Sequence, residues 1–416
     1  MSIVRRAGFR FVLAYLALYS FPFPIGVIPG TSFLSNAYTK IWDALALWVG
    51  SHVLHVAITV TQDNGSGDRT FDYLQNFCVL VLAAIAALIW TVAAPRASDT
   101  RIYRALRVYV RYVLGFTLIS YGTFKIIQTQ FPFPRLARLV QPYGESSPMG
   151  LLWTFMGYSK PYNFFAGLAE AGGGCLLFFR RTTTLGGLTV FAVMLNVVML
   201  NFCYDVPVKI YSMNLLIMAA FLVAPDLRRL ANLLVLNRPT APIDAAPLSQ
   251  NRWLRTGAWA LKALLIGVML YSPTKQALDA EKQYGSKAPR PALYGIYDVE
   301  VYVRNGETLP PLTTDATRWR RVIFSAGSVS VKTMTDTPLF YRADFDPAKK
   351  TVTLHDAKDK NNNWTLAYAR PDADHLTIEG LLAKEPVSAR LLRVDESKFL
   401  LVNRGFHWIN EFPFNR

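Results

Sequence analysis

Residues Asn163–Asp226 read NFFAGLAEAGGGCLLFFRRTTTLGGLTVFAVMLNVVMLNFCYDVPVKIYSMNLLIMAAFLVAPD. The stretch covers three apolar segments long enough to cross a membrane, predicted at Tyr162–Phe179, Leu185–Cys203 and Ile210–Ala224. Glu170 lies in the middle of the first segment. An ionisable group at that depth costs on the order of several kcal/mol unless it is paired, neutralised or hydrated. The rest of the membrane part is therefore expected to supply Glu170 with partners and an entrance.

The composition of the whole chain is typical of a membrane protein. Of its 416 residues, 52% are hydrophobic and only 17% are charged. Residues 1–272 carry 23 Lys and Arg against 10 Asp and Glu, whereas residues 273–416 carry 21 against 18. The basic excess thus lies in the apolar half and on one side of the predicted spans, so it does not indicate a nucleic-acid partner.

Seven transmembrane helices are predicted within a domain spanning residues 1–272. Besides the three above, the apolar segments are Phe9–Ile28, Thr70–Ala94, Arg104–Thr129 and Trp253–Tyr271. The stretch Thr31–Thr61 has only partly helical spacing of its apolar residues, which favours an interfacial or re-entrant helix.

The distribution of basic residues predicts the orientation. With the N-terminus in the cytoplasm, the inner segments hold 15 arginines and the outer segments hold 6 lysines and arginines. We therefore expect a multi-pass protein of a bacterial inner membrane, in contact with the lipid bilayer. Its N-terminus would be cytoplasmic and its C-terminal domain extracytoplasmic (periplasmic).

The C-terminal part is predicted to be all-β. A linker at residues 273–292, partly helical at Thr274–Tyr284, leads into a domain at residues 293–416. Short alternating segments predict strands at Tyr294–Val303, Trp319–Phe324, Ser328–Thr333, Leu339–Phe345, Thr351–His355, Trp364–Ala369, His375–Leu381, Val387–Val394 and Phe399–Val402. Eight or nine meandering strands indicate a small up-and-down barrel or a curved, partly open sheet. The aromatic tail Gly405–Arg416 is expected to dock on the barrel mouth or on the membrane domain.

Polar residues gather in the outer halves of the predicted spans. At about 1.5 Å per residue, Glu170 lies roughly 15 Å below the outer end of its helix. Lys125 lies in the outer quarter of the preceding span and is the predicted charge partner of Glu170 in a proton-transfer pair. The other candidate ligand-binding residues are Tyr121, Gln128, Asn163, Asn196, Asn201, Tyr204, Asp205, Lys209 and Asn214. The pattern predicts a polar funnel that narrows to Glu170, although hydrogen bonding that merely joins the helices would use the same residue types.

Histidine and cysteine provide weaker candidates. His52 and His55 are close enough on one helical face to contact a ligand, but no third ligand accompanies them and no metal site is predicted. Cys78 and Cys203 both fall toward the outer side, where a redox pair or ordinary packed thiols are the alternatives.

The membrane half resembles the DoxX family over about Arg101 to Ala224. The resemblance is carried by Ser120-Tyr-Gly-Thr-Phe-Lys125, by Gly167-Leu-Ala-Glu170-Ala-Gly-Gly-Gly174, and by the methionines of the Leu185–Cys203 span. It implies a four-helix membrane core associated with membrane oxidoreductases, quinone-linked sulfur oxidation or oxidative-stress complexes, with Lys125 and Glu170 as its polar pair. The chain departs from this family by its additional helices and its β-domain. Membrane helices followed by an extracytoplasmic β-domain are also distantly similar to the vitamin K-dependent carboxylase group.

Three functional hypotheses follow. The first is an outward-facing pocket that binds a quinone, a lipid-like molecule or a small redox-linked ligand within a membrane redox system. The second is a non-catalytic anchor or assembly subunit whose β-domain and tail bind a membrane oxidoreductase or an extracytoplasmic partner protein. The third is a proton-coupled transporter or a carboxylase-like membrane enzyme.

Overall fold

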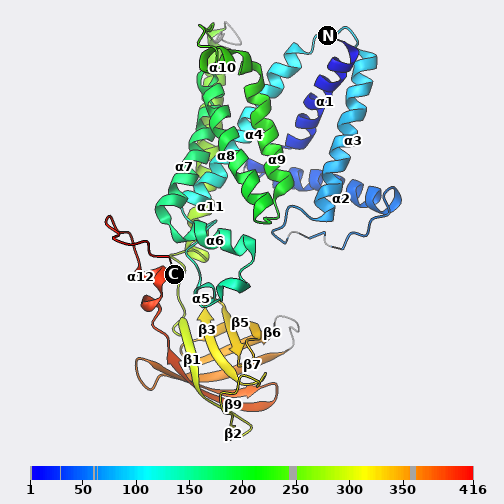
Figure 1. Ribbon diagram of the computed structural model, residues 1–416. Helices are drawn as coiled ribbons and strands as arrows, with labels where there is room; N and C mark the ends of the chain where they lie inside the picture. The colour runs from blue at the N-terminus through cyan, green and yellow to red at the C-terminus, as the bar shows by residue number, and fades with distance from the viewer. Residues whose placement is uncertain are drawn as a thin grey trace. The chain divides into compact units, whose positions relative to one another are not determined.

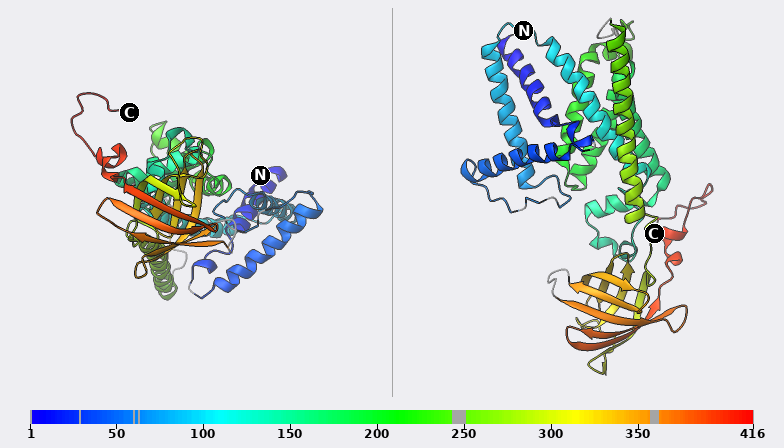
Figure 2. Two further views of the ribbon diagram at one scale, coloured as in Figure 1. Left: turned by 90° about the horizontal axis from the view of Figure 1, so that it is seen from below. Right: turned by 180° about the vertical axis from the view of Figure 1, so that it is seen from behind.

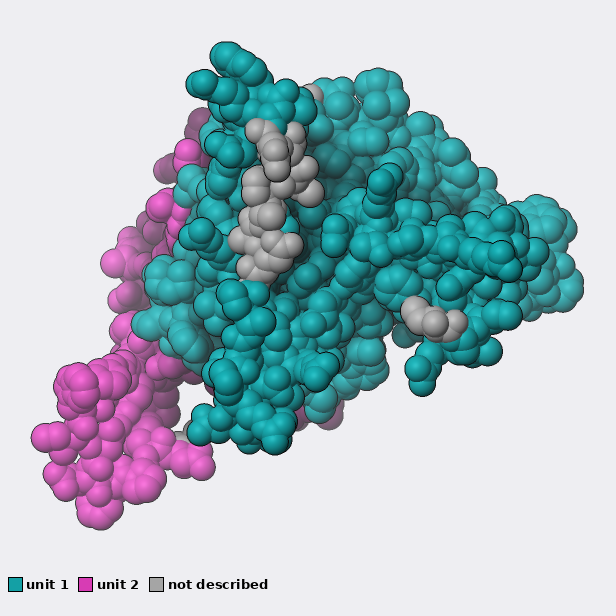
Figure 3. Space-filling view, turned by 90° about the horizontal axis from the view of Figure 1, so that it is seen from above, with its two compact units in different colours: residues 1–131, 148–152, 159–279 teal, residues 132–147, 153–158, 280–416 magenta. Residues whose placement is uncertain are grey.

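The computed structural model describes residues 2–28, 30–59, 61–62, 64–242, 251–356 and 362–415. The chain forms two compact units, coloured separately in Figure 3. A helical unit comprises residues 1–131, 148–152 and 159–279, and a β-unit comprises residues 132–147, 153–158 and 280–416.

The helical unit is a bundle of long helices (Figure 1). Its long helices are α1 (Ile3–Ser20), α2 (Ser32–His52), α3 (Thr70–Ala93), α4 (Thr100–Ile126), α7 (Lys160–Leu177), α8 (Thr183–Cys203), α9 (Lys209–Val223) and α11 (Arg252–Gln283). The short elements η1 (Ile25–Val27), η3 (Arg180–Thr182), η4 (Ala224–Asp226) and α10 (Leu227–Leu234) join them. α4 packs against α7, α7 against α8, α8 against α9, and α1 against α3.

Several of these helices can cross a membrane. Within the described part of the chain, five are long and apolar enough: Ile3–Val27, Thr70–Ala93, Arg180–Cys203, Lys209–Leu234 and Arg252–Gln283. The predicted spans that contain α4 and α7 are not among the five, and α4 carries four arginines in its first half. The total of about seven spans therefore stays a prediction.

Helix α2 differs from its neighbours in direction. Figures 1 and 2 show it running across the ends of α1 and α3 rather than along them. Apart from Trp42, Ala46 and Gly50, its residues are at least partly exposed. One face of α2 is buried and the others are open, and its interfacial or re-entrant position stays a prediction.

Buried ion pairs close the end of the bundle where α1 and α4 begin. The fully buried Arg10 pairs with Asp99 at 2.9 Å and donates to the Trp90 carbonyl at 2.8 Å. Arg107 and Arg229 both contact Asp226, at 3.2 and 2.9 Å. A lone buried charge is costly, so these pairs allow the basic loops to pack against the helix ends.

The β-unit is a closed barrel. Its strands follow in chain order as β1 (Gly295–Arg304), β3 (Trp319–Ser325), β4 (Ser328–Thr333), β5 (Pro338–Asp346), β6 (Thr351–Asp356), β7 (Asn363–Ala369), β8 (His375–Leu382) and β9 (Glu385–Arg393). Each is antiparallel to the next, and β9 pairs back with β1, for example Ala389 with Tyr302. β2 (Glu307–Thr308) only extends β1. Closure removes the open edges, so the meander is an eight-stranded barrel and not an open sheet.

Side chains fill the barrel. Alternate residues point inward, and the buried set includes Tyr297, Tyr302, Trp319 and Phe324 among many aliphatic residues. An eight-stranded barrel has room for little more than such side chains. Leu136 of the short helix α5 (Leu136–Leu139) packs against Ile296 and Ile323 on the outside. The barrel is therefore a packed core and not a channel.

Several predicted boundaries were wrong. The proposed last strand Phe399–Val402 is helical, as η5 (Glu396–Lys398) and α12 (Leu400–Asn403), because the barrel already closes at β9. The predicted loop after α4 contains α5, η2 (Tyr143–Glu145) and α6 (Pro148–Tyr158). The helical stretch predicted at Thr274–Tyr284 is present, but it joins the predicted span Trp253–Tyr271 in one helix, α11, which continues through Pro273 to Gln283 because good helix formers follow the apolar part.

The aromatic tail does not dock on the barrel. Phe406, Trp408, Ile409 and Phe412 are 78, 91, 77 and 83% exposed. Contacts within the tail include the edge-on packing of Phe406 against Trp408 and the Arg404 guanidinium over the Phe414 ring. Arg416 lies outside the described residues.

Candidate functional site

Helices α4 and α7 cross at two pairs of glycines. A Cβ atom on Gly122 would lie 2.5 Å from the Gly167 carbonyl oxygen, and a Cβ on Gly167 would lie 2.6 Å from the Gly122 carbonyl. Seven residues along each helix, a Cβ on Gly174 would lie 2.7 Å from the Gly115 carbonyl. Such distances exclude any side chain, so the two backbones touch because glycine is present on both sides.

This close crossing brings Lys125 and Glu170 together. Each lies three residues beyond a crossing glycine, so both side chains emerge beside the contact. The Lys125 ammonium donates a hydrogen bond to Glu170 Oε1, and the two side chains are only 8 and 4% exposed. The residues predicted as a charge pair are therefore a buried ion pair between α4 and α7.

Two buried oxygen atoms near this crossing lack a donor. Asn163 is fully buried on α7 and donates to the Phe131 carbonyl at 3.0 Å. Among the described residues, neither Asn163 Oδ1 nor Glu170 Oε2 accepts a hydrogen bond. An unsatisfied buried acceptor costs about 1–3 kcal/mol. Glu170 can therefore accept a proton or a hydrogen bond through Oε2 while Oε1 holds Lys125.

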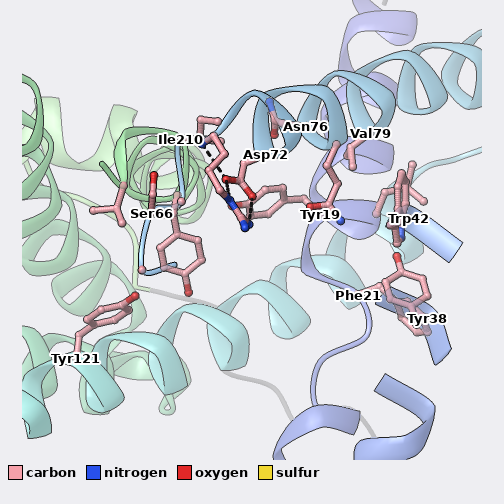
Figure 4. Close-up of a pocket in the computed structure, with 17 residues that line it drawn as sticks. Tyr19, Phe21, Tyr38, Trp42, Ser66, Asp72, Asn76, Val79, Tyr121 and Ile210 are labelled. Atoms are coloured by element: carbon pink, nitrogen blue, oxygen red, sulfur yellow. Dashed lines mark hydrogen bonds and ion pairs between the residues drawn. The ribbon is translucent and has the colours of Figure 1, made fainter. Parts of the chain in front are cut away.

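A cavity of about 650 Å³ lies at the end of the helical unit where α1 and α4 finish and α3 and α9 begin (Figure 4). Aromatic rings form much of its wall: Tyr19, Phe21, Tyr38, Trp42, Tyr121 and Tyr211. Ser66, Arg69, Asp72, Gln75 and Asn76 provide the polar lining. In Figure 4, Tyr38 and Trp42 lie on one side and Tyr121 on the other, with Tyr19 between them. The wall suits a flat ring that also forms hydrogen bonds.

The polar rim of the cavity is held by two acidic residues. Asp68 accepts hydrogen bonds from the backbone N–H groups of Lys209 and Ile210, at 2.7 and 3.0 Å, and so caps α9. Asp72 accepts from Arg69 Nε and Nη2, both at 2.8 Å. These contacts tie the loop before α3 to the start of α9, which fixes one wall of the cavity.

A second polar cluster joins α1, α3 and α9. The Tyr15 hydroxyl lies 3.0 Å from Asn76 Oδ1 and 2.5 Å from Asn214 Oδ1. Asn214 Nδ2 donates to the Ile210 carbonyl at 3.0 Å. Asn214 therefore belongs to this cluster and not to the surroundings of Glu170.

The structure does not bring the remaining predicted residues into one funnel. Tyr121 lines the cavity, but neither Lys125 nor Glu170 does. Asn196 is exposed on α8, and Asp205 is exposed and pairs with Lys209 at 3.0 Å. Asn201 is buried near the end of α8, whereas Tyr204 and Gln128 are half-buried in turns. A helical rotation of 100° per residue separates neighbouring positions, so polar residues at equal depth face different partners.

Histidines and cysteines form no site in the part of the chain that the structure describes. His52 and His55 are exposed, and His52 stacks on Trp48 at 5.3 Å. No group of three or more metal-binding side chains occurs among the described residues. Cys78 is buried, Cys203 is exposed, and both are free thiols.

Sequence reasoning missed much of the cavity wall. Tyr19 falls in a segment predicted as an apolar span and Tyr38 in the predicted interfacial helix, and Asp72 and Asn76 open a span that otherwise reads as uniformly apolar. One signal was available: Asp72 stands three residues after Arg69 at a helix start, the spacing of a capping pair. Convergence of five helices on one cavity has no such local signal.

Comparison with known proteins finds similarity to one uncharacterized bacterial protein. The chain is 32% identical over 122 residues to the uncharacterized protein YwoB of Bacillus subtilis (strain 168). The matched region is 29% of this chain and 75% of YwoB. No family model matches the chain, and no solved structure matches it.

Proposed function

The chain belongs to the family of the uncharacterized Bacillus subtilis protein YwoB, and we propose that it binds a quinone, a lipid-like molecule or another small redox-linked ligand in the membrane. The observation that carries the proposal is the cavity at the ends of α1 and α4, with its aromatic walls and amide side chains. Such a wall combines stacking surfaces with a few hydrogen-bonding groups, which is how proteins hold flat amphipathic molecules.

The buried pair next to the cavity gives the proposal its chemistry. Tyr121 lines the cavity, and Lys125 lies one helical turn further along the same face of α4. We assign Lys125 and Glu170 as a proton-transfer pair, with Glu170 Oε2 as the atom that accepts or releases a proton. A ligand whose charge changes on reduction would need such a group close by. The DoxX-like pattern around these two residues supports a role in a membrane redox system.

The proposed location is a bacterial inner membrane, with the N-terminus in the cytoplasm. Support comes from the excess of basic residues on one side of the spans and from the ion pairs of Arg10, Arg107 and Arg229 at the corresponding helix ends. The cavity lies at the opposite ends of the same helices, so in this orientation it faces outward. The β-barrel would then be periplasmic.

The test is ligand retention by the full-length protein. Native mass spectrometry of the detergent-extracted chain is expected to detect a bound molecule that Tyr211→Ala loses, because Tyr211 lines the cavity. Asn196→Ala, on the exposed face of α8, is the matched control and should retain it. Glu170→Gln should keep the ligand but change the ligand's redox state or the rate at which the protein turns it over. If all three variants retain the ligand and turn it over as the unaltered protein does, the proposal loses its basis.

The exposed tail favours a second candidate function, that of an anchor or assembly subunit. Apolar side chains exposed to the extent of Trp408 and Phe412 commonly mark a partner-binding segment. Deletion of residues 405–416 would then break a complex that co-purifies with the full chain. A purified chain that is fully active by itself would count against this second function.

A further inference from the structure

A second cavity adjoins the one described above. It measures about 440 Å³ and runs along α1, α3 and α9, lined mainly by apolar side chains such as Val12, Leu16, Leu80, Met213 and Ile217. Two residues, Asn76 and Ile210, line both cavities. The two spaces therefore lie on either side of these residues, with a polar and aromatic chamber on one side and a mainly apolar groove on the other.

Asn76 offers a hydrogen bond at this junction. The Tyr15 hydroxyl lies 3.0 Å from the Asn76 amide and 2.5 Å from Asn214 Oδ1, and its single proton serves only one of these two amides. Among the described residues the Asn76 amide has no other hydrogen-bond partner, while a half-buried amide normally uses both of its ends. One end of the Asn76 amide therefore faces Tyr15, and the other end can bond to a ligand.

The charges in the aromatic cavity cancel. Among its described lining residues, Arg69 and Asp72 are the ionised ones, and they form a two-point ion pair with each other. Arg69 Nη1 also donates to the carbonyls of Thr61 and Gln62, at 3.3 and 2.5 Å. The guanidinium is committed to these contacts and is not presented to an anion. The lining therefore favours an uncharged head group.

We propose that the two cavities form one bipartite site for an amphipathic ligand with an uncharged, flat head and an apolar chain. The head lies among the rings of the aromatic cavity and forms a hydrogen bond with the free end of the Asn76 amide. The chain passes the junction and lies along the groove between α1 and α9. This inference rests on the proposed function and narrows it to neutral-headed ligands, whether isoprenoid quinones or neutral lipids.

The test measures binding to full-length protein in nanodiscs. The probes are a benzoquinone with one isoprene unit, the same head with eight units, diacylglycerol and phosphatidylglycerol. Met213→Trp fills the groove and is expected to weaken the eight-unit quinone about tenfold while leaving the one-unit quinone unchanged. Asn76→Leu is expected to weaken both quinones. Leu195→Trp, exposed on α8 and outside both cavities, is the control. Ile217→Phe is a milder groove variant should Met213→Trp fail to fold.

The outcomes separate the inference from the proposed function. If the groove variants leave the eight-unit quinone unaffected while Tyr211→Ala still abolishes binding, the bipartite site is wrong and the proposed function stands. Tighter binding of phosphatidylglycerol than of the neutral probes overturns the uncharged head. Diacylglycerol binding with the same response to the groove variants supports the inference with a lipid as source. If no probe binds to the unaltered protein, the proposed function itself fails.

Discussion

The Lys125–Glu170 ion pair gives the sharpest test of how the helical unit is held together. Lys125→Met removes the ammonium but keeps a long flexible side chain in the same space. Glu170 is then left 4% exposed, and its Oε2 has no partner among the described residues. Breaking a buried pair in this way costs about 3–5 kcal/mol. We expect the free energy of unfolding of Lys125→Met to fall by that amount.

The double variant shows whether Lys125→Met is destabilised by the loss of the attraction between the two charges or by the unpaired Glu170 carboxylate left in the interior. In Lys125→Met/Glu170→Leu both charges are gone and the volume is kept, so the unfolding free energy should return to at least the wild-type value within about 1 kcal/mol. Unfolding by SDS in mixed micelles, followed by tryptophan fluorescence, measures the free energy of unfolding of the wild type, the single variant and the double variant. Lys160→Met, exposed on α7, is the matched control and should change stability by less than about 0.5 kcal/mol.

Two results would refute this reasoning. One is a double variant as unstable as Lys125→Met alone, which would mean that the pair stabilises the fold and does not merely neutralise itself. The other is an unchanged Lys125→Met, which would mean that Glu170 is solvated or protonated without Lys125. A stable double variant that loses its bound ligand would assign the pair to function and not to folding.

Three further predictions follow from local geometry. Gly122→Ala should lower the unfolding free energy by about 1–3 kcal/mol, because its Cβ meets the α7 backbone. Gly172→Ala, in open space, should raise the unfolding free energy by up to about 1 kcal/mol. The reverse order of the two variants in the same SDS assay would contradict the glycine crossing. Asp68→Ala should lower the unfolding free energy by about 1 kcal/mol through loss of the α9 cap, and the bound ligand should dissociate faster. An unchanged ligand dissociation rate would show that the loop before α3 is not part of the cavity wall. In the barrel, the hydrogen bond with Asn363 and the contact with Asp344 raise the pKa of His355 above its ordinary value. The protonated ring therefore adds stability that is fully present below about pH 6.5 and is lost as the pH rises through the folded pKa. Histidine NMR titration of the intact protein should record a lower His355 pKa in Asn363→Leu, and an unshifted pKa would exclude this hydrogen bond.

Local sequence pattern determined the elements of this protein. Runs of apolar residues marked the helices of the bundle, and two-residue alternation marked the eight strands of the barrel, because both periodicities arise within one segment. The pairing of Lys125 with Glu170 was also predictable. Glu170 is the one charged residue of its predicted span, Lys125 is the one charged residue in the outer half of its own, and each stands near glycines that permit a close crossing.

Only the tertiary structure decided which segments meet. Barrel closure joins β1 to β9 across the whole length of the domain, and this pairing, not any local signal, excludes the last predicted strand. The aromatic cavity needs α1, α2, α3, α4 and α9 together. Packing also places Asn214 against Tyr15 on α1, whereas its depth in the sequence had grouped it with Glu170. Depth in a membrane can be counted along one helix, but the direction in which a side chain points depends on the rotation of that helix against its neighbours, and packing sets that rotation.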